Sequence, residues 1–139
     1  DGNTYTSNNL EWQIATAAKN DGLSNGLTWY YNAKLYWDDA VSYCSNLELA
    51  GKTDWRLPTK FELISLIEPQ NPGPFIDSRL YATTLSSTVP SSNPWSEYWS
   101  SSTQQSNNVY VYYVDFGTGA EWYLKKTGVL PLFVRCVRP

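Results

Sequence analysis

The sequence predicts an α+β fold, with two helices packed on a twisted antiparallel sheet and long irregular loops. Apolar residues recur at helical spacing over 37–50 and 60–68, whereas the last third of the chain has the composition of strands. This order, a strand-like start followed by helices and then strands, is typical of α+β proteins. The chain of 139 residues is predicted to form one domain, 1–139, with a sizeable core.

The first segment is polar, with short strands expected at Leu10–Ile14 and Leu27–Tyr31 and turn signals at 20–22 and 25–26. A first helix is predicted from Trp37 to Ala50, ending at Gly51. Its inward face is formed by residues at helical spacing, namely Trp37, Val41, Cys44 and Leu47. Asp38 and Asp39 lie in its first turn, where the helix dipole favours negative charge.

A second helix is predicted to begin after Thr59, because Thr59 and Glu62 have the spacing of a capping box. Pro69 is expected to end this helix. Its apolar face is expected to comprise Phe61, Leu63, Ile64, Leu66 and Ile67. Before the cap, Trp55 and Arg56 are interpreted as structural residues.

Residues 69–94 are predicted to be a long irregular region that docks on the core through a few apolar anchors. Strands are predicted beyond it at Tyr98–Ser102, Val109–Phe116, Ala120–Lys126 and Leu132–Arg138, with a hairpin turn at 117–119. In the last strand, Leu132, Val134 and Cys136 share an inward face, whereas Phe133 and Arg135 point the other way.

The composition favours a binding surface over contact with nucleic acid. Aromatic residues make up 16%, with 7 Trp and 11 Tyr, and many of these rings are expected at the surface. The net charge of -3 argues against nucleic acid and anionic membranes as partners. No apolar run is long enough to enter a membrane. Because the chain begins with Asp1, we expect a processed or excised domain whose targeting signal lies outside it.

The two cysteines, Cys44 and Cys136, lie too far apart in the sequence for a local metal motif. The sequence contains no His to complete a zinc site. Two interpretations remain, a disulfide or two buried thiols. Low charge and many Ser, Thr, Asn and Tyr residues favour the disulfide, which is typical of extracytoplasmic proteins.

We do not expect an enzyme. Serine and cysteine nucleophiles lack their usual His base, and no motif distinguishes one pair of carboxylates among the 13 acidic residues. No cofactor is certain and the metal ligands are unknown. A calcium site is one interpretation of scattered oxygen donors, although ordinary loop residues explain them better. These donors are Glu68, Asn71, Asp77, Asn93, Glu97 and Asp115.

Recognition is expected within residues 93–123, where aromatic rings alternate with residues capable of adaptable hydrogen bonding. The candidate ligand-binding residues are Trp95, Glu97, Tyr98, Asn107, Asn108, Tyr110, Tyr112 and Trp122. For Tyr110 and Tyr112, which lie opposite Val109 and Val111 on their strand, the preference of strands for aromatic residues is an equal alternative. Trp95, Asn107 and Asn108 are favoured because loops usually carry binding residues.

The chain resembles the bacterial domain of unknown function at the C-terminus of Legionella collagen-like adhesins. The resemblance covers nearly the whole chain and depends on the order of the segments Leu10–Gln13, Trp37–Cys44, Leu49–Thr59, Glu62–Leu63, Tyr98–Ser102 and Val134–Arg138. It implies a C-type-lectin-like fold and a disulfide from the first helix to the last strand, in agreement with the pairing of Cys44 and Cys136.

The resemblance also implies an extracellular or cell-surface protein that acts in bacterial adhesion. We expect the domain to bind glycans, with a protein or peptide ligand as the first alternative. A cap that trimerises a fibrous stalk is the second alternative, since the collagen-like adhesins are trimeric. Those adhesins bind sulfated glycosaminoglycans, but this chain is acidic, with a net charge of -3.

Overall fold

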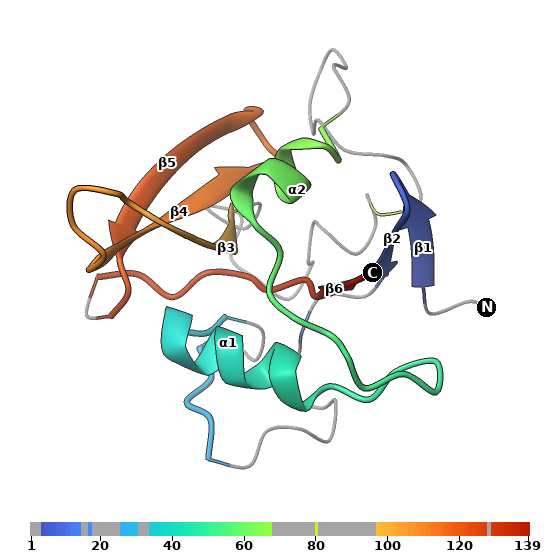
Figure 1. Cartoon of the computed structure of the whole chain (residues 1–139). Coiled ribbons are helices and arrows are strands. Elements are labelled where there is room, and N and C mark those ends of the chain that lie inside the picture. Colours follow the sequence, from blue (N-terminus) through green and yellow to red (C-terminus); the bar gives the residue numbers. More distant parts are fainter. Residues whose placement is uncertain are drawn as a thin grey trace.

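The computed structural model describes residues 4–14, 17, 26–30, 34–67, 80, 97–127 and 129–139. Trp95, the turn at 20–22 and nearly all of the irregular region 69–94 lie outside these residues. Within the described part, the fold is α+β, as predicted, with two helices and two antiparallel sheets. The helices are α1 (Trp37–Asn46) and α2 (Lys60–Ile64). Figure 1 shows α1 and α2 on different sides of the C-terminal segment.

The first sheet has the strand order β1-β2-β6, formed by β1 (Thr4–Ser7), β2 (Leu10–Gln13) and β6 (Val137–Arg138). The predicted strand at Leu10–Ile14 is thus confirmed as β2, and β1 was not expected. Asn8 and Asn9 connect β1 and β2 with φ of 55° and 63°. Asn tolerates this left-handed conformation, and such two-residue turns match the twist of antiparallel strands.

The second sheet has the order β3-β4-β5, formed by β3 (Glu97–Thr103), β4 (Tyr110–Asp115) and β5 (Ala120–Lys125). All three strands and the turn between β4 and β5 were predicted. Leu27–Tyr31 was not confirmed as a strand, because its described residues form only an isolated bridge from Tyr30 to Lys34.

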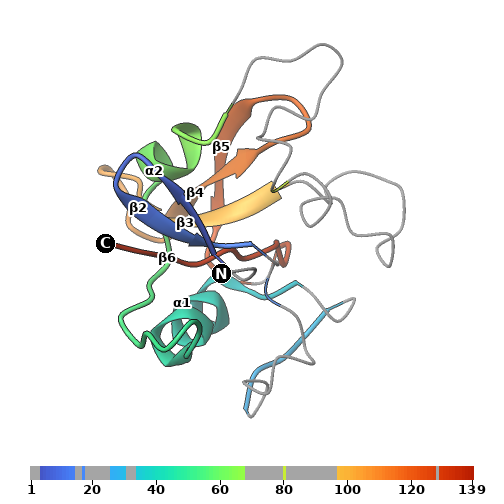
Figure 2. The ribbon, with the colours of Figure 1, turned by 90° about the vertical axis from the view of Figure 1, so that its right-hand side faces the viewer.

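The C-terminal segment 132–138 passes between α1 on one side and α2 with the second sheet on the other, in both views (Figures 1 and 2). Only Val137 and Arg138 form a strand, and single bridges join Leu132 to Leu35 and Phe133 to Tyr98. The predicted strand is therefore mostly irregular, because its partners change along its length.

The segment nevertheless alternates between two hydrophobic cores, which we call the α1 core and the α2 core. Leu132, Val134 and Cys136 enter the α1 core, with Tyr43, Trp55 and Trp99 among its other members. Phe133 and Val137 enter the α2 core with Trp12, Leu63, Leu66, Leu80, Tyr98, Val114 and Phe116. The predicted alternation of side chains is thus correct, and both faces are buried.

α1 ends at Asn46, earlier than the predicted Ala50. Leu47 already has extended backbone, with φ of -70° and ψ of 130°. Ala50 and Gly51 then form a turn with φ of 55° and 73°. The apolar spacing that suggested a longer helix persists because Leu47 is still buried beyond the helix end.

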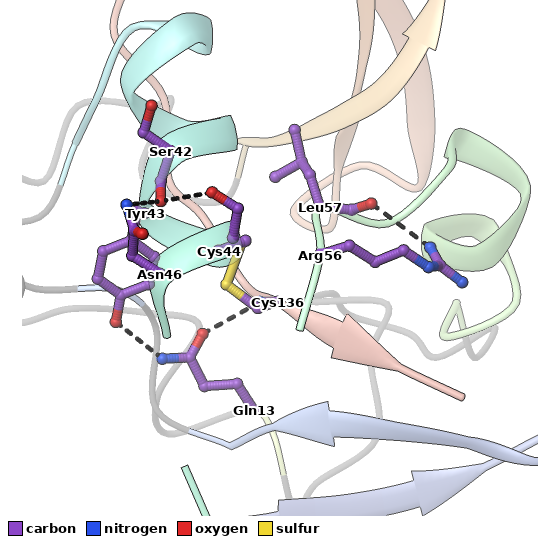
Figure 3. The surroundings of a disulfide bond; sticks show 9 residues. Gln13, Ser42, Tyr43, Cys44, Asn46, Arg56, Leu57 and Cys136 are labelled. Atoms are coloured by element: carbon purple, nitrogen blue, oxygen red, sulfur yellow. Dashed lines mark hydrogen bonds between the residues drawn. A yellow bond between two sulfur atoms is a disulfide. The ribbon is translucent and has the colours of Figure 1, made fainter. Parts of the chain in front are cut away.

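The predicted disulfide is present between Cys44 of α1 and Cys136, which directly precedes β6 (Figure 3). Beside it, the Gln13 side chain donates to the Tyr43 hydroxyl and accepts from the Cys136 N–H, both at 3.0 Å. The side-chain amide of Gln13, in β2, therefore joins α1 and the C-terminal segment beside the disulfide. This arrangement connects the first sheet to the α1 core.

Candidate functional site

An open hollow of about 520 Å³ lies where the start of α2 meets the end of β3, and we call it the α2 groove. Its lining combines two aromatic rings, one of them phenolic, with two amides, three aliphatic hydroxyls and one ammonium group. The residues are Lys60, Phe61, Ser102, Thr103, Gln104, Gln105, Ser106 and Tyr112.

Local hydrogen bonds hold the start of α2 against β3. Thr59 and Glu62 form the predicted capping box, and Arg56 adds a two-pronged ion pair to the Glu62 carboxylate at 2.7 and 2.8 Å. The Ser102 hydroxyl accepts the Lys60 N–H at 2.9 Å, and the Ser101 N–H donates to the Pro58 carbonyl at 2.7 Å. The N-terminal turn of α2 is therefore attached to the sheet.

Lys60 is enclosed by the groove and not extended into solvent. Its Nζ lies 3.8 Å from the ring centroid of Tyr112 and 3.5 Å from the Glu121 carboxylate. Its side chain is only 17% exposed. The ammonium group thus has an aromatic and an anionic neighbour, which favours a fixed position.

Three tyrosines extend the groove along β4 and β5. Tyr123 makes edge-to-face contacts with Tyr110 and Tyr112, at centroid distances of 5.6 and 6.0 Å. Tyr110 and Tyr112 alternate along β4 with Val111, which is buried in the α1 core, and Tyr123 of β5 is the cross-strand partner of Tyr112. The tyrosines therefore cover the opposite face of the sheet from that core.

Phe61 supplies the most accessible ring of the groove, with 71% of the residue exposed. This corrects the prediction that Phe61 belongs to the apolar face of the helix. Leu63 and Leu66 are buried, and Phe61 precedes Leu63 by two positions, which places it on nearly the opposite side of the helix. The two-position offset of Phe61 from the buried Leu63 is thus the feature of the sequence that identifies Phe61 as exposed.

The loop from β3 to β4 forms the rim of the groove. Its backbone is closed by hydrogen bonds from Asn107 N–H to Gln104 O and from Tyr110 N–H to Asn107 O, at 3.3 and 3.1 Å. The Asn107 side chain accepts the Val109 N–H at 3.1 Å. Asn107 therefore shapes the loop, and its neighbour Asn108 is exposed.

The structure brings only some of the predicted ligand-binding residues together. Tyr112 lines the groove, Tyr110 adjoins it through Tyr123, and Asn107 and Asn108 lie in the adjoining loop. Trp122 is 61% exposed and does not line the groove; its cross-strand partner is Tyr113, and its ring stacks on that of Tyr123 at a centroid distance of 5.1 Å.

Tyr98 is fully buried in the α2 core, where its ring packs against Phe116 and Phe133. It therefore contributes to the core and not to the exposed surface. Trp95 lies outside the described residues.

Glu97 is 9% exposed and faces the interior near Tyr113, Lys34 and Asp115. The pKa of Glu97 is raised to about 7, chiefly by burial and to a smaller extent by the neighbouring Asp115 carboxylate. The Tyr113 hydrogen bond and the Lys34 charge oppose this shift. Burial, together with Glu97, raises the pKa of Tyr113 to about 12.

Among the described residues, no three Asp, Glu, Cys or His side chains are grouped as metal ligands. Of the proposed calcium donors, Glu97 and Asp115 are cross-strand partners at the end of the second sheet. Glu68, Asn71, Asp77 and Asn93 fall outside the described part of the chain.

The family model described as the Lcl C-terminal domain matches residues 4–138. The match spans both cysteines, both helices and every groove residue. No curated protein matches the chain. In the part of the chain that the structure describes, no helix has the length and apolar character needed to cross a membrane.

Proposed function

The chain belongs to the Lcl C-terminal domain family, which is associated with adhesins at the bacterial surface, and from this premise we propose that it is an extracellular glycan-binding domain. We further propose that it has a C-type-lectin-like fold. The bridge from the first helix to the C-terminal segment, with a small antiparallel sheet beside it, supports that proposal.

The observation that carries the proposal is the α2 groove. An exposed Phe61 ring on one wall offers an apolar face to a sugar ring, and Gln104, Gln105 and Ser106 on the rim offer amide and hydroxyl groups to its hydroxyls. The volume of about 520 Å³ suits a small ligand, since such sites typically measure roughly 300–1,000 Å³.

We propose binding without catalysis. The one cation of the groove lining, Lys60, lies against Tyr112 and Glu121. The remaining lining residues are aromatic, amide or hydroxyl side chains, which orient ligands better than they transfer protons. Calcium is not required by this chemistry, because amides and hydroxyls hydrogen-bond sugars directly.

The test begins with a glycan array of neutral and sulfated sugars, followed by calorimetry on the best ligand. Phe61→Ala is expected to weaken that binding at least about fivefold, or about 1 kcal/mol, because a stacking ring is lost. Val129→Ala is the control, since Val129 is also exposed, at 50%, but does not line the groove. Chelator is expected to leave the affinity unchanged.

Equal effects of the two substitutions, or a silent array with folded protein, would contradict the proposal. A protein or peptide ligand is the second candidate, favoured by the row of Tyr110, Tyr112 and Tyr123 beside adaptable polar residues. It predicts a partner whose binding no sugar competes with and which weakens on Tyr110→Ala.

A further inference from the structure

β5 is the outer strand of the second sheet as far as the structure describes the chain. Figure 1 shows it at the outer edge of the molecule, beyond β4. An edge strand carries backbone N–H and C=O groups on its free side that can pair with another strand.

The register identifies the residues that face the free edge. The Lys126 N–H donates to the Val109 carbonyl at 3.1 Å, and β4 and β5 continue in antiparallel register from Tyr110 opposite Lys125. Because hydrogen-bonded pairs alternate along antiparallel strands, residues 120, 122 and 124 direct their backbone groups to β4. Glu121, Tyr123 and Lys125 therefore direct theirs outward.

These outward residues are complementary to themselves under a two-fold rotation. If Tyr123 lies opposite Tyr123 of a second copy, Glu121 lies opposite Lys125 of that copy, and the reciprocal pair forms at the other end. The intervening Trp122, 61% exposed, then lies opposite Leu124 of the second copy on the other face of the sheet. Opposite charges and apolar pairs placed across strands in this way stabilise a sheet.

We propose that two copies of this chain associate through their β5 edges, in antiparallel register centred on Tyr123, into one continuous sheet. Each outward residue then donates and accepts a backbone hydrogen bond across the interface. The interface is isologous, as in most symmetric dimers.

The same charges oppose two of the shifted registers. Moving the centre of symmetry by two residues places Glu121 opposite Glu121 or Lys125 opposite Lys125, and like charges directly opposite each other are destabilising. Charged residues commonly protect an edge strand from pairing. Here their positions, four residues apart and opposite in sign, disfavour those two registers, and among all registers only the centred one pairs Glu121 with Lys125.

A two-fold axis through such a sheet is perpendicular to it, so the tyrosine faces of both copies lie on the same side. If the proposed function holds, the two α2 grooves open in the same direction and one dimer binds a glycan surface at two points. Two linked sites raise the apparent affinity without any new contact. The dimer itself does not depend on the glycan and is tested separately.

The test is sedimentation equilibrium over a wide range of protein concentration, without glycan. The wild-type chain is expected to reach a dimer. Glu121→Lys and Lys125→Glu are each expected to weaken self-association at least tenfold, because each places like charges at both ends of the interface. An equimolar mixture of the two variants is expected to restore a dimer, since every opposed pair is then of opposite sign.

Both substitutions are at exposed positions, so circular dichroism should show that each variant folds. The restored mixture distinguishes a charge pair across the interface from any local effect of either substitution. A wild-type chain that is monomeric or trimeric at all concentrations, single variants that dimerise like wild type, or a mixture that stays monomeric would each overturn the proposal.

Discussion

Glu97 carries a carboxyl group at the start of β3, turned toward the interior near Tyr113 and Lys34. Its folded pKa of about 7 lies above the ordinary value of 4.5, chiefly because burial disfavours the charged form. The folded protein therefore binds this proton more tightly than the unfolded chain. The stability that the protonated group contributes is complete below pH 4.5 and is lost as the pH rises to about 7.

Glu97→Gln tests this linkage because glutamine stays neutral at every pH. The free energy of unfolding of the variant, minus that of wild type, is expected to rise between pH 5 and pH 7, by at most about 1.4 kcal/mol per pH unit, and then to level off. Urea denaturation at several pH values measures it. Gln105→Ala, exposed on the loop after β3, should parallel wild type throughout. A difference that does not vary with pH would refute the assignment.

Three tyrosines show how well the sequence predicts which residues of the candidate site are exposed. Tyr112 and Tyr110 were predicted correctly to lie opposite Val111, since strand alternation is a local property. Tyr98 has the same residue type but is buried, because α2 and the C-terminal segment cover that end of the sheet. Whether a strand residue is covered depends on elements distant in sequence, and alternation alone does not report it.

Among the elements, α2 has very few helical residues of its own and depends on its cap. The capping box satisfies backbone N–H groups at its start, and the Arg56 guanidinium holds the pKa of Glu62 below its ordinary value. A helix this short has little intrinsic stability, so the cap and the sheet contacts maintain it. Because Lys60 and Phe61 occupy its first turn, the cap also maintains one wall of the groove.

Thr59→Ala removes the side-chain acceptor of the cap, which is the Thr59 hydroxyl bonded to the Glu62 N–H at 3.2 Å. We expect the free energy of unfolding to fall by about 1 kcal/mol, within the range known for such caps. Affinity for the groove ligand should fall as well, because the wall loosens. Chemical denaturation and calorimetry measure the two effects. Thr53→Ala, exposed in the loop before Trp55, is the matched control. Unchanged stability would show that the sheet contacts alone hold α2.

The elements differ in how well the sequence predicts them. The α2 capping box depends only on Thr59 and Glu62, three positions apart, so the sequence predicted it at the correct residues. The end of α1 and the course of residues 132–136 were not predicted, because Leu47 and Leu132 are buried by partners elsewhere in the chain. A buried residue beyond a helix end has the same spacing as one inside it.

At the scale of the whole molecule, the C-terminal segment joins parts of the chain that are far apart in sequence. Arg138 bonds Glu11 of β2 and Asp54 of the loop before α2, both at 2.6 Å. The fully buried Arg135 donates to the carbonyls of Gln13 and Ile14. The disulfide completes this set by attaching α1 across a sequence separation of 92 residues. The C-terminal segment thus contributes side chains to both cores, and the disulfide attaches α1 to this segment.

Closing a loop as long as 92 residues lowers the entropy of the unfolded chain, and the chain-entropy model gives a stabilisation of about 4–5 kcal/mol. We therefore expect the Cys44→Ala, Cys136→Ala double variant to unfold at much lower denaturant concentration than wild type. Reductant should shift the wild-type transition in the same direction but leave the variant unaffected. A loss below about 1 kcal/mol would show that the hydrogen bonds of Gln13, which contacts both Tyr43 of α1 and Cys136, hold the segment to α1 without the bridge.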